Sequence, residues 1–355
     1  MKQLIMMMTL AAAVTASAQA GQEMTDDYQL VWSDEFNGTS LDERAWNVEV
    51  NGNGGGNQEL QYYTRDNVTI ETEPTSGASC LTLTAARKNY RGKSFVSGRL
   101  NTQNKLFFTY GRVEARIMLP KTANGLWPAF WMLGNDFQQV GWPRCGEVDI
   151  LEMGDGTGIS QQKQEYRFNG ACHWGYYNGQ GQYPNYARSS NAPYSLQDGE
   201  FHLFTAVWDE HKIRMYLDLD RNPDASPYYE IGVESFEDDW GTGHYFNKDF
   251  FIVFDLAVGG LYTGILEPNK ITALPNSGDE AKMYIDYVRV YQKNDNSSFI
   301  TVPEGYSTRI SEVAPSSTSE VSAVFDLMGR QLSRLPKHRI CLVRTDKGFV
   351  KVMTK

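Results

Sequence analysis

Glu147-Val148-Asp149-Ile150-Leu151-Glu152 places three carboxylates within six residues of an otherwise apolar run. The three apolar residues between the acids favour a β-strand. Side chains alternate along a strand, so Glu147 and Asp149 share one face while Glu152 would point to the other. If all three acids act together, the strand must absorb one extra residue between Asp149 and Glu152. A β-bulge does this, and bulges are over-represented beside active sites.

Two glutamates on one face are what a retaining glycosidase needs, with carboxyl groups about 5–5.5 Å apart. The alternative for the same residues is a solvated acidic edge or a calcium site. Trp127, Trp131 and Trp142 lie shortly upstream. Clustered carboxylates on a half-buried face are costly unless a proton or a partner relieves them. We therefore interpret the three acids as tuned catalytic groups.

The first 20 residues predict an export signal. Lys2 is followed by an apolar run over 4–14 and by Ala18-Gln19-Ala20. A basic start, a short apolar core and an A-x-A end are typical of a secretory signal cleaved after Ala20. The run is too short for a membrane anchor. We expect a secreted protein, located in the periplasm, at the cell surface or outside the cell, with no membrane insertion.

The charge is strongly uneven along the chain. The net charge of the whole chain is −10. Residues 1–20 carry +1 and residues 296–355 carry +4, so residues 21–295 must carry −15. An acidic body argues against nucleic acid and polyanionic substrates, which prefer basic grooves. A neutral polymer fits better, and we expect the protein to be a monomer.

From Leu30 to Gln292 the chain predicts an all-β domain. Short alternating or apolar runs recur between turn residues, at 81–85, 111–119, 201–209, 213–217, 250–258 and 283–292. Many short strands over this length predict a two-sheet sandwich. We assign residues 21–293 to this domain, 294–322 to a Ser/Thr-rich linker and 323–355 to a small C-terminal β module with three short strands.

Four cysteines, at 80, 145, 172 and 341, are too few to predict a disulfide framework. Cys145 and Cys172 lie in adjacent predicted strands and could pair. His173 follows Cys172 and could hydrogen-bond a carboxylate. The Gly-rich loop at 51–59 either binds sugar hydroxyls or is only a mobile turn. Glu35 and Asp286 lie near opposite ends of the domain, where paired terminal strands could bring their oxygens to a calcium ion.

The chain resembles glycoside hydrolase family 16, on the laminarinase/β-glucanase side, over residues 28–292. The resemblance rests on motifs in the same order, at 32–36, 57–63, 110–116, 125–133, 146–153, 173–175, 256–260 and 284–291. It implies a concanavalin-like β-jelly roll with a sugar cleft across one sheet. It further implies Glu147 as nucleophile, Glu152 as acid/base and Asp149 as the helper between them.

The resemblance also implies which other residues serve the site. Those expected to line the cleft are Asn57, Arg99, Trp127, Trp131 and His173. Glu35 and Asp286 correspond to positions that hold a structural calcium ion in many members, whereas no cofactor is implied for catalysis. Asp255 departs from the pattern, because laminarinases usually carry Asn there; if it faces the cleft, we expect it to alter subsite preference.

The tail resembles C-terminal sorting modules of Bacteroidetes secreted proteins, through residues 324–330, 335–337 and Gly348. It departs from them at residues 338–341, where Gly-Ile-Tyr is usual. For the whole protein we expect a retaining endo-β-glucanase for β-1,3 or mixed β-1,3/1,4 glucan. The alternatives are a non-catalytic β-glucan-binding protein and a galactan-active, agarase- or porphyranase-like member of the family.

Overall fold

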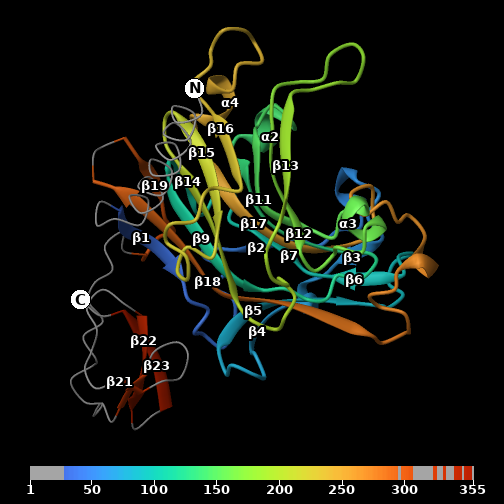
Figure 1. Cartoon of the computed structure of the whole chain (residues 1–355), viewed down its shortest axis with the longest axis vertical. Coiled ribbons are helices and arrows are strands. Elements are labelled where there is room, and N and C mark those ends of the chain that lie inside the picture. The colour runs from blue at the N-terminus through green and yellow to red at the C-terminus, as the bar shows by residue number, and fades with distance from the viewer. Residues whose placement is uncertain are drawn as a thin grey trace, which may run out of the picture. The chain divides into compact units, whose positions relative to one another are not determined.

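Two antiparallel-rich sheets packed face to face form the main body of the protein. A computed structural model describes residues 28–294, 297–306, 323–325, 331–332, 340–345 and 348–353. The predicted export signal at 1–20 and most of the predicted linker lie outside these residues. The chain divides into two compact units, one up to Tyr306 and one from Ser307 onward. The prediction of an all-β two-sheet sandwich is confirmed (Figure 1).

The ten-stranded sheet follows the order β16-β15-β14-β9-β18-β5-β6-β3, with β1 paired to β18 and β4 paired to β5. Its strands are β1 (Tyr28–Asp34), β3 (Gln61–Tyr63), β4 (Val68–Thr72), β5 (Ser79–Ala86), β6 (Phe95–Ser97), β9 (Gly111–Met118), β14 (His202–Trp208), β15 (Lys212–Leu217), β16 (Tyr229–Gly232) and β18 (Glu280–Lys293).

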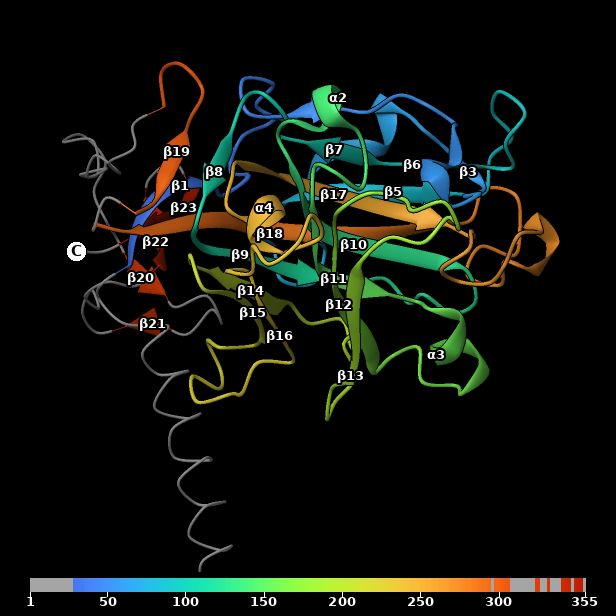
Figure 2. The same ribbon diagram turned by 90° about the horizontal axis from the view of Figure 1, so that it is seen from above.

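The nine-stranded sheet follows the order β13-β12-β11-β10-β17-β7-β2, with β8 joining β17 to β19. Its strands are β2 (Asn47–Val48), β7 (Arg99–Asn101), β8 (Phe107–Thr109), β10 (Leu126–Gly134), β11 (Glu147–Met153), β12 (Arg167–His173), β13 (Asn185–Asn191), β17 (Phe250–Val258) and β19 (Phe299–Thr301). Figure 2 shows β10, β11, β12 and β13 side by side in this sheet.

Helices are short and lie in the connections. Among the described residues, the α-helices are α2 (Phe137–Val140), α3 (Gly156–Ser160) and α4 (Gly243–Phe246), and the 3₁₀ turns are η1 (Gly54–Gly56), η2 (Arg65–Asn67) and η3 (Pro268–Lys270). No helix in the described part of the chain combines the length and the apolar character that crossing a bilayer requires.

Alternation along two central strands gives the nine-stranded sheet its two faces. On β10, Phe130 and Met132 join the large core between the sheets, whereas Trp131 and Leu133 belong to a smaller cluster. On β17, Phe251 and Val253 extend that smaller cluster. The period of two therefore separates an apolar inner face from a second face on which aromatic and acidic side chains gather.

The two cysteines predicted as a possible pair are free thiols. Cys172 lies in the core between the sheets, whereas Cys145 belongs to the cluster on the other face. The sheet separates the two sulfur atoms, which is the physical reason that the possible pair does not form.

The main unit extends further than the predicted boundary at 293. Residues 299–301 form β19, which pairs with β8, and the hydroxyl of Tyr306 donates to Oδ2 of Asp42 at 2.7 Å. Ile300 and Val302 pack against the core, so the start of the stretch predicted as a linker is drawn into the sandwich by its apolar residues.

The second unit contains a four-stranded sheet in the order β21-β20-β22-β23. Its strands are β20 (Ala323–Phe325), β21 (Gln331–Leu332), β22 (Ile340–Thr345) and β23 (Gly348–Met353). The three strands predicted for the C-terminal module are present, and β21 is additional. The role of this module in sorting stays a prediction.

Candidate active site

The predicted irregularity is present in β11. Strand β10 pairs Trp131 with Asp149 and Phe130 with Leu151, so Ile150 is the extra residue. The register with β12 shifts at the same place. Ile150 has no register partner on either neighbour, and its carbonyl accepts a hydrogen bond from the buried hydroxyl of Tyr228. Ile150 and Leu151 both enter the core as a result.

Because of this bulge, Glu147, Asp149 and Glu152 all line one groove on the outer face of the nine-stranded sheet. The groove encloses about 660 Å³. Its aromatic lining is Tyr63, Trp127, Trp131, Phe137, Trp142, Tyr177, Tyr183 and Phe251, and its other acidic residues are Glu49, Glu59 and Asp255. Aromatic rings with a few polar groups are a common design for a sugar-binding site.

The two outer acids each receive one indole hydrogen bond. Nε1 of Trp142 donates to Oε2 of Glu147, and Nε1 of Trp127 donates to Oε1 of Glu152, both at 3.1 Å. Burial raises the pKa of Glu147 to about 7, against the lowering effects of Trp142 and Arg99. Burial, followed by the charge of Glu147, raises the pKa of Glu152 to about 8. Both carboxyl groups therefore hold a proton to higher pH than free glutamate does.

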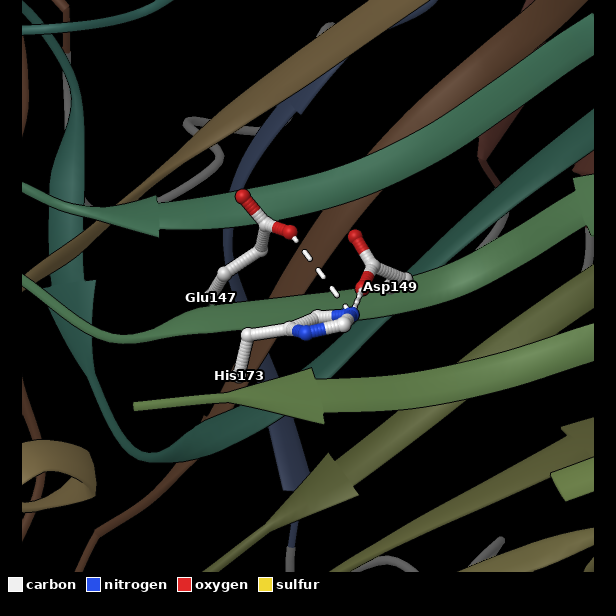
Figure 3. Close-up of side chains that lie close together, drawn as sticks. All are labelled: Glu147, Asp149 and His173. Atoms are coloured by element: carbon white, nitrogen blue, oxygen red, sulfur yellow. Dashed lines mark ion pairs between the residues drawn. The ribbon is translucent and has the colours of Figure 1, made fainter. Parts of the chain in front are cut away.

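Asp149 lies between the two glutamates and beside a histidine of the neighbouring strand. Figure 3 shows Glu147 and Asp149 with the ring of His173 turned toward both. Nε2 of His173 lies 3.4 Å from Oδ2 of Asp149 and 4.0 Å from Oε1 of Glu147. Burial, and then the charges of Glu147 and Glu152, raise the pKa of Asp149 well above its ordinary value. Asp149 therefore favours its protonated form more than a free aspartate does.

His173 is a neutral neighbour rather than a counter-ion. Burial lowers the pKa of its imidazole to about 4. Its Nδ1 lies 3.1 Å from the hydroxyl of Tyr183, which orients the ring. The donor atoms of Glu147, Asp149 and His173 lie within 4.8 Å of one another, a spacing that would also permit a metal ion.

The structure brings most of the predicted sugar-binding residues together. Asn57, Arg99, Trp127 and Trp131 all line the groove, and His173 supports the acids from β12. The ring of Trp127 stacks on Tyr262 with centroids 4.5 Å apart, which leaves its nitrogen directed at Glu152. The guanidinium of Arg99 lies 4.9 Å from the centroid of Trp131. Their contacts with sugar stay predictions.

The loop at 51–59 lines the groove, and its binding of sugar hydroxyls stays a prediction. Oδ1 of Asn53 accepts from the amide of Gly55, and Gly54, Gly55 and Gly56 all have left-handed φ values. A Cβ at Gly55 would lie 2.1 Å from Oε1 of Glu59, so glycine permits the close approach.

Sequence reasoning missed several groove residues. Glu59, Tyr63, Trp142 and Tyr183 line the groove with partners in the site, and Asp255, noted only as a departure, faces it as well. Tyr63 ends the motif at 57–63 and Trp142 lies five residues before Glu147, so a motif argument could have found both. Tyr183 comes from a long loop whose path the sequence does not encode locally.

The two acids predicted to hold calcium are placed with arginines. Glu35 accepts from Nε and Nη2 of Arg289 at 2.7 and 2.8 Å, and Asp286 accepts from Arg116 at 2.9 Å. Calcium takes six to eight oxygen ligands. Neither acid belongs to a group of three or more acid, His or Cys ligands among the described residues. These side chains alone therefore do not fit the ion, and the calcium site stays a prediction.

Comparisons with known proteins find similar sequences and a similar fold. A family model described as beta-glucan synthesis-associated protein SKN1/KRE6/Sbg1 matches residues 2–144. The chain is 33% identical to a beta-glucanase of Rhodothermus marinus over 80% of this chain and 93% of that protein. It is 31% identical to glucan endo-1,3-beta-glucosidase A1 of Niallia circulans over 74% of this chain, but it spans only 38% of that protein's length.

A solved structure extends the likeness to three dimensions. The mixed linkage glucan PUL GH16 of Bacteroides ovatus, solved in complex with a G4G4G3G product, is 38% identical, with a TM-score of 0.64. The match covers 74% of this chain and 100% of that one. The all-β sandwich therefore matches the jelly roll of these enzymes. With its sheets, its bulged acid strand and these relatives, the chain belongs to glycoside hydrolase family 16.

Proposed function

We propose that this protein is a retaining endo-β-glucanase that hydrolyses β-1,3 or mixed β-1,3/1,4 glucan by double displacement. The observation that carries the proposal is the bulge at Ile150, which turns Glu147, Asp149 and Glu152 into one groove. Two carboxyl groups flanking one bond are the apparatus of this chemistry. The relatives named as β-glucanases support the choice of substrate.

In the first step, ionised Glu147 attacks the anomeric carbon while Glu152 gives its proton to the leaving oxygen. The electrostatics of the groove agree with this division, because the charge of Glu147 is one of the causes that raise the pKa of Glu152. In the second step, Glu152 takes a proton from water while the water oxygen attacks the anomeric carbon, and the bond between that carbon and Glu147 breaks.

Asp149 serves this cycle by holding a proton beside Glu147. A neutral Asp149 adds no charge when Glu147 is ionised, and its proton can be shared with the nucleophile. His173 stays neutral at the same time, so it does not neutralise the attacking carboxylate. During the reaction, only Glu147 and Glu152 then change their charge.

The lining supports a neutral polymer as substrate. Aromatic side chains offer apolar platforms to sugar rings, and amides and carboxyl groups can bond to hydroxyls. Arg99 is paired with Glu49 at 3.0 Å and so is not an isolated cation for a sulfate group.

We also propose that residues 1–20 are removed on export, which N-terminal sequencing of the protein from the culture would test.

The decisive experiment compares Glu147→Gln and Glu152→Gln with wild type on laminarin, lichenan and agarose, with Glu237→Gln at an exposed acid as control. We expect wild type and the control to release reducing sugar from laminarin or lichenan with retention at the anomeric carbon. Each catalytic variant should lose at least about 10³-fold in kcat. Near wild-type turnover in either variant, release from agarose alone, or binding without cleavage would contradict the proposal.

A further inference from the structure

The carboxyl group of Asp255 joins two sides of the groove. Asp255 lies on β17 opposite Ala129 of β10 and is 5% exposed. Its Oδ1 accepts a hydrogen bond from Nε1 of Trp131 at 2.7 Å. Its Oδ2 lies 3.3 Å from the hydroxyl oxygen of Tyr63, which belongs to the other sheet. One side chain thus contacts an indole and a phenol that come from separate layers.

The phenol of Tyr63 has more acceptors than protons. Its oxygen lies 3.1 Å from Oε2 of Glu59 as well as 3.3 Å from Oδ2 of Asp255. A neutral phenol donates a single hydrogen bond. Burial, and then the nearby carboxyl charges, raise the pKa of Tyr63, so it remains neutral. If it donates to the closer Glu59, its lone pair faces Asp255, and that contact is favourable only when Asp255 carries a proton.

The charges around Asp255 favour that proton. One cation, Arg99, faces it from β7 as its register partner, but the guanidinium is also paired with Glu49. The acids that face the same groove are Glu49, Glu59, Glu147, Asp149 and Glu152. Burial raises the pKa of Asp255 to about 6, even with Arg99 acting in the opposite direction.

We propose that Asp255, as a neutral acid, is a positioning residue of the glucan groove: it accepts from Trp131 and donates to Tyr63. The inference rests on the proposed function, because the indole is taken to contact the sugar. The ring is then fixed at its edge by Asp255 and on its face by Arg99. When Asp255 loses its proton, its Oδ2 and Glu59 compete for one phenolic hydrogen, and the link between the two layers weakens.

The structure suggests a matched pair of variants. Asp255→Asn keeps both contacts, because its amide oxygen can accept from Trp131 and its NH₂ group can donate to Tyr63, and it has no proton to lose. Asp255→Leu has a similar size and makes neither contact. Trp131→Phe removes the indole donor from the other side, and the Asp255→Leu/Trp131→Phe double variant completes a cycle.

We would measure kcat and KM on laminarin and lichenan from about pH 5 to about pH 8. The KM of wild type should rise about fivefold as Asp255 ionises, while that of Asp255→Asn stays low throughout. Asp255→Leu should have a KM raised about tenfold at every pH, with a smaller change in kcat. Adding Trp131→Phe to it should cost less than the sum of the two single effects.

Infrared spectroscopy supplies a readout that needs no turnover. The wild-type minus Asp255→Asn difference at about pH 5 should contain the band of a protonated carboxyl group, which disappears as the pH rises through about 6. Absence of that band overturns the proposal even if the protein cleaves glucan. So does a KM of Asp255→Asn that matches Asp255→Leu, or an Asp255→Leu variant equal to wild type. If the band is present but no glucan is cleaved, the proposed function fails and the protonation of Asp255 stands.

Discussion

The indole nitrogen of Trp142 donates a hydrogen bond to Oε2 of Glu147 at 3.1 Å. At the other end of the acid strand, Trp127 does the same for Glu152. Each indole stabilises the ionised form of its carboxyl partner and so lowers that pKa against the effect of burial. The pKa of each catalytic candidate is therefore lowered by a different tryptophan, which can be replaced separately.

Trp142→Phe should move the acid limb of the kcat/KM profile to higher pH. Without the indole donor the pKa of Glu147 rises further, so the nucleophile becomes ionised only at higher pH. A hydrogen bond to a charged group corresponds to a shift of about one pH unit. A pH profile on laminarin would measure it, and an acid limb that stays in place would show that Glu147 does not control it.

Trp127→Phe should instead move the alkaline limb to higher pH. Loss of its N–H raises the pKa of Glu152, so the general acid keeps its proton longer, again by about one pH unit. The acid limb should be unchanged, which makes the two tryptophan variants controls for each other. Equal movement of both limbs in both variants would contradict the assignment of roles to Glu147 and Glu152.

Asp149→Asn should stabilise the protein most at neutral pH. The folded-state pKa of Asp149 is raised, whereas an unfolded aspartate titrates at about 3.9. The folded state therefore binds the extra proton, and wild-type stability falls as pH rises from about 4 toward the raised pKa. Asparagine has no such dependence. Thermal unfolding should show a gain in Tm at pH 7 that shrinks toward about pH 4.

The control for that experiment is Asp224→Asn at an exposed position, which should leave Tm nearly unchanged at pH 7 and at about pH 4. A fall in Tm for Asp149→Asn at neutral pH would mean that the carboxyl group stabilises the fold. A gain in Tm together with a loss of activity would place Asp149 among groups that are retained for function at a cost in stability.

Tyr228→Phe should destabilise the bulge. Its hydroxyl donates to the carbonyl of Ile150, a residue that has no register partner on β10 or β12. An unsatisfied buried acceptor costs about 1–3 kcal/mol. Chemical denaturation would measure the loss, and Tyr177→Phe, at a half-exposed phenol, is the comparison. Equal stability of wild type and Tyr228→Phe would show that the bulge does not depend on this bond.

Much of the fold could be predicted from local pattern. The strand predicted at 250–258 has the same bounds in the structure, and the strand predicted at 111–119 differs by one residue from β9. The predicted linker was wrong at its start, because 299–301 pair with a strand nearly 200 positions earlier in the chain. Pairing with a strand so remote leaves no periodic signal in the sequence of residues 299–301.

The sequence by itself determined one condition: the three acids can share a face only if β11 contains an extra residue. This follows because side-chain alternation is a local property of the backbone. Only the tertiary structure decided what surrounds them. The indole at 142, the phenol at 63 and the carboxyl at 255 come from separate elements, and sheet packing brings them to one groove. The charge and proton of each acid depend on burial and on these distant neighbours, which no local pattern encodes.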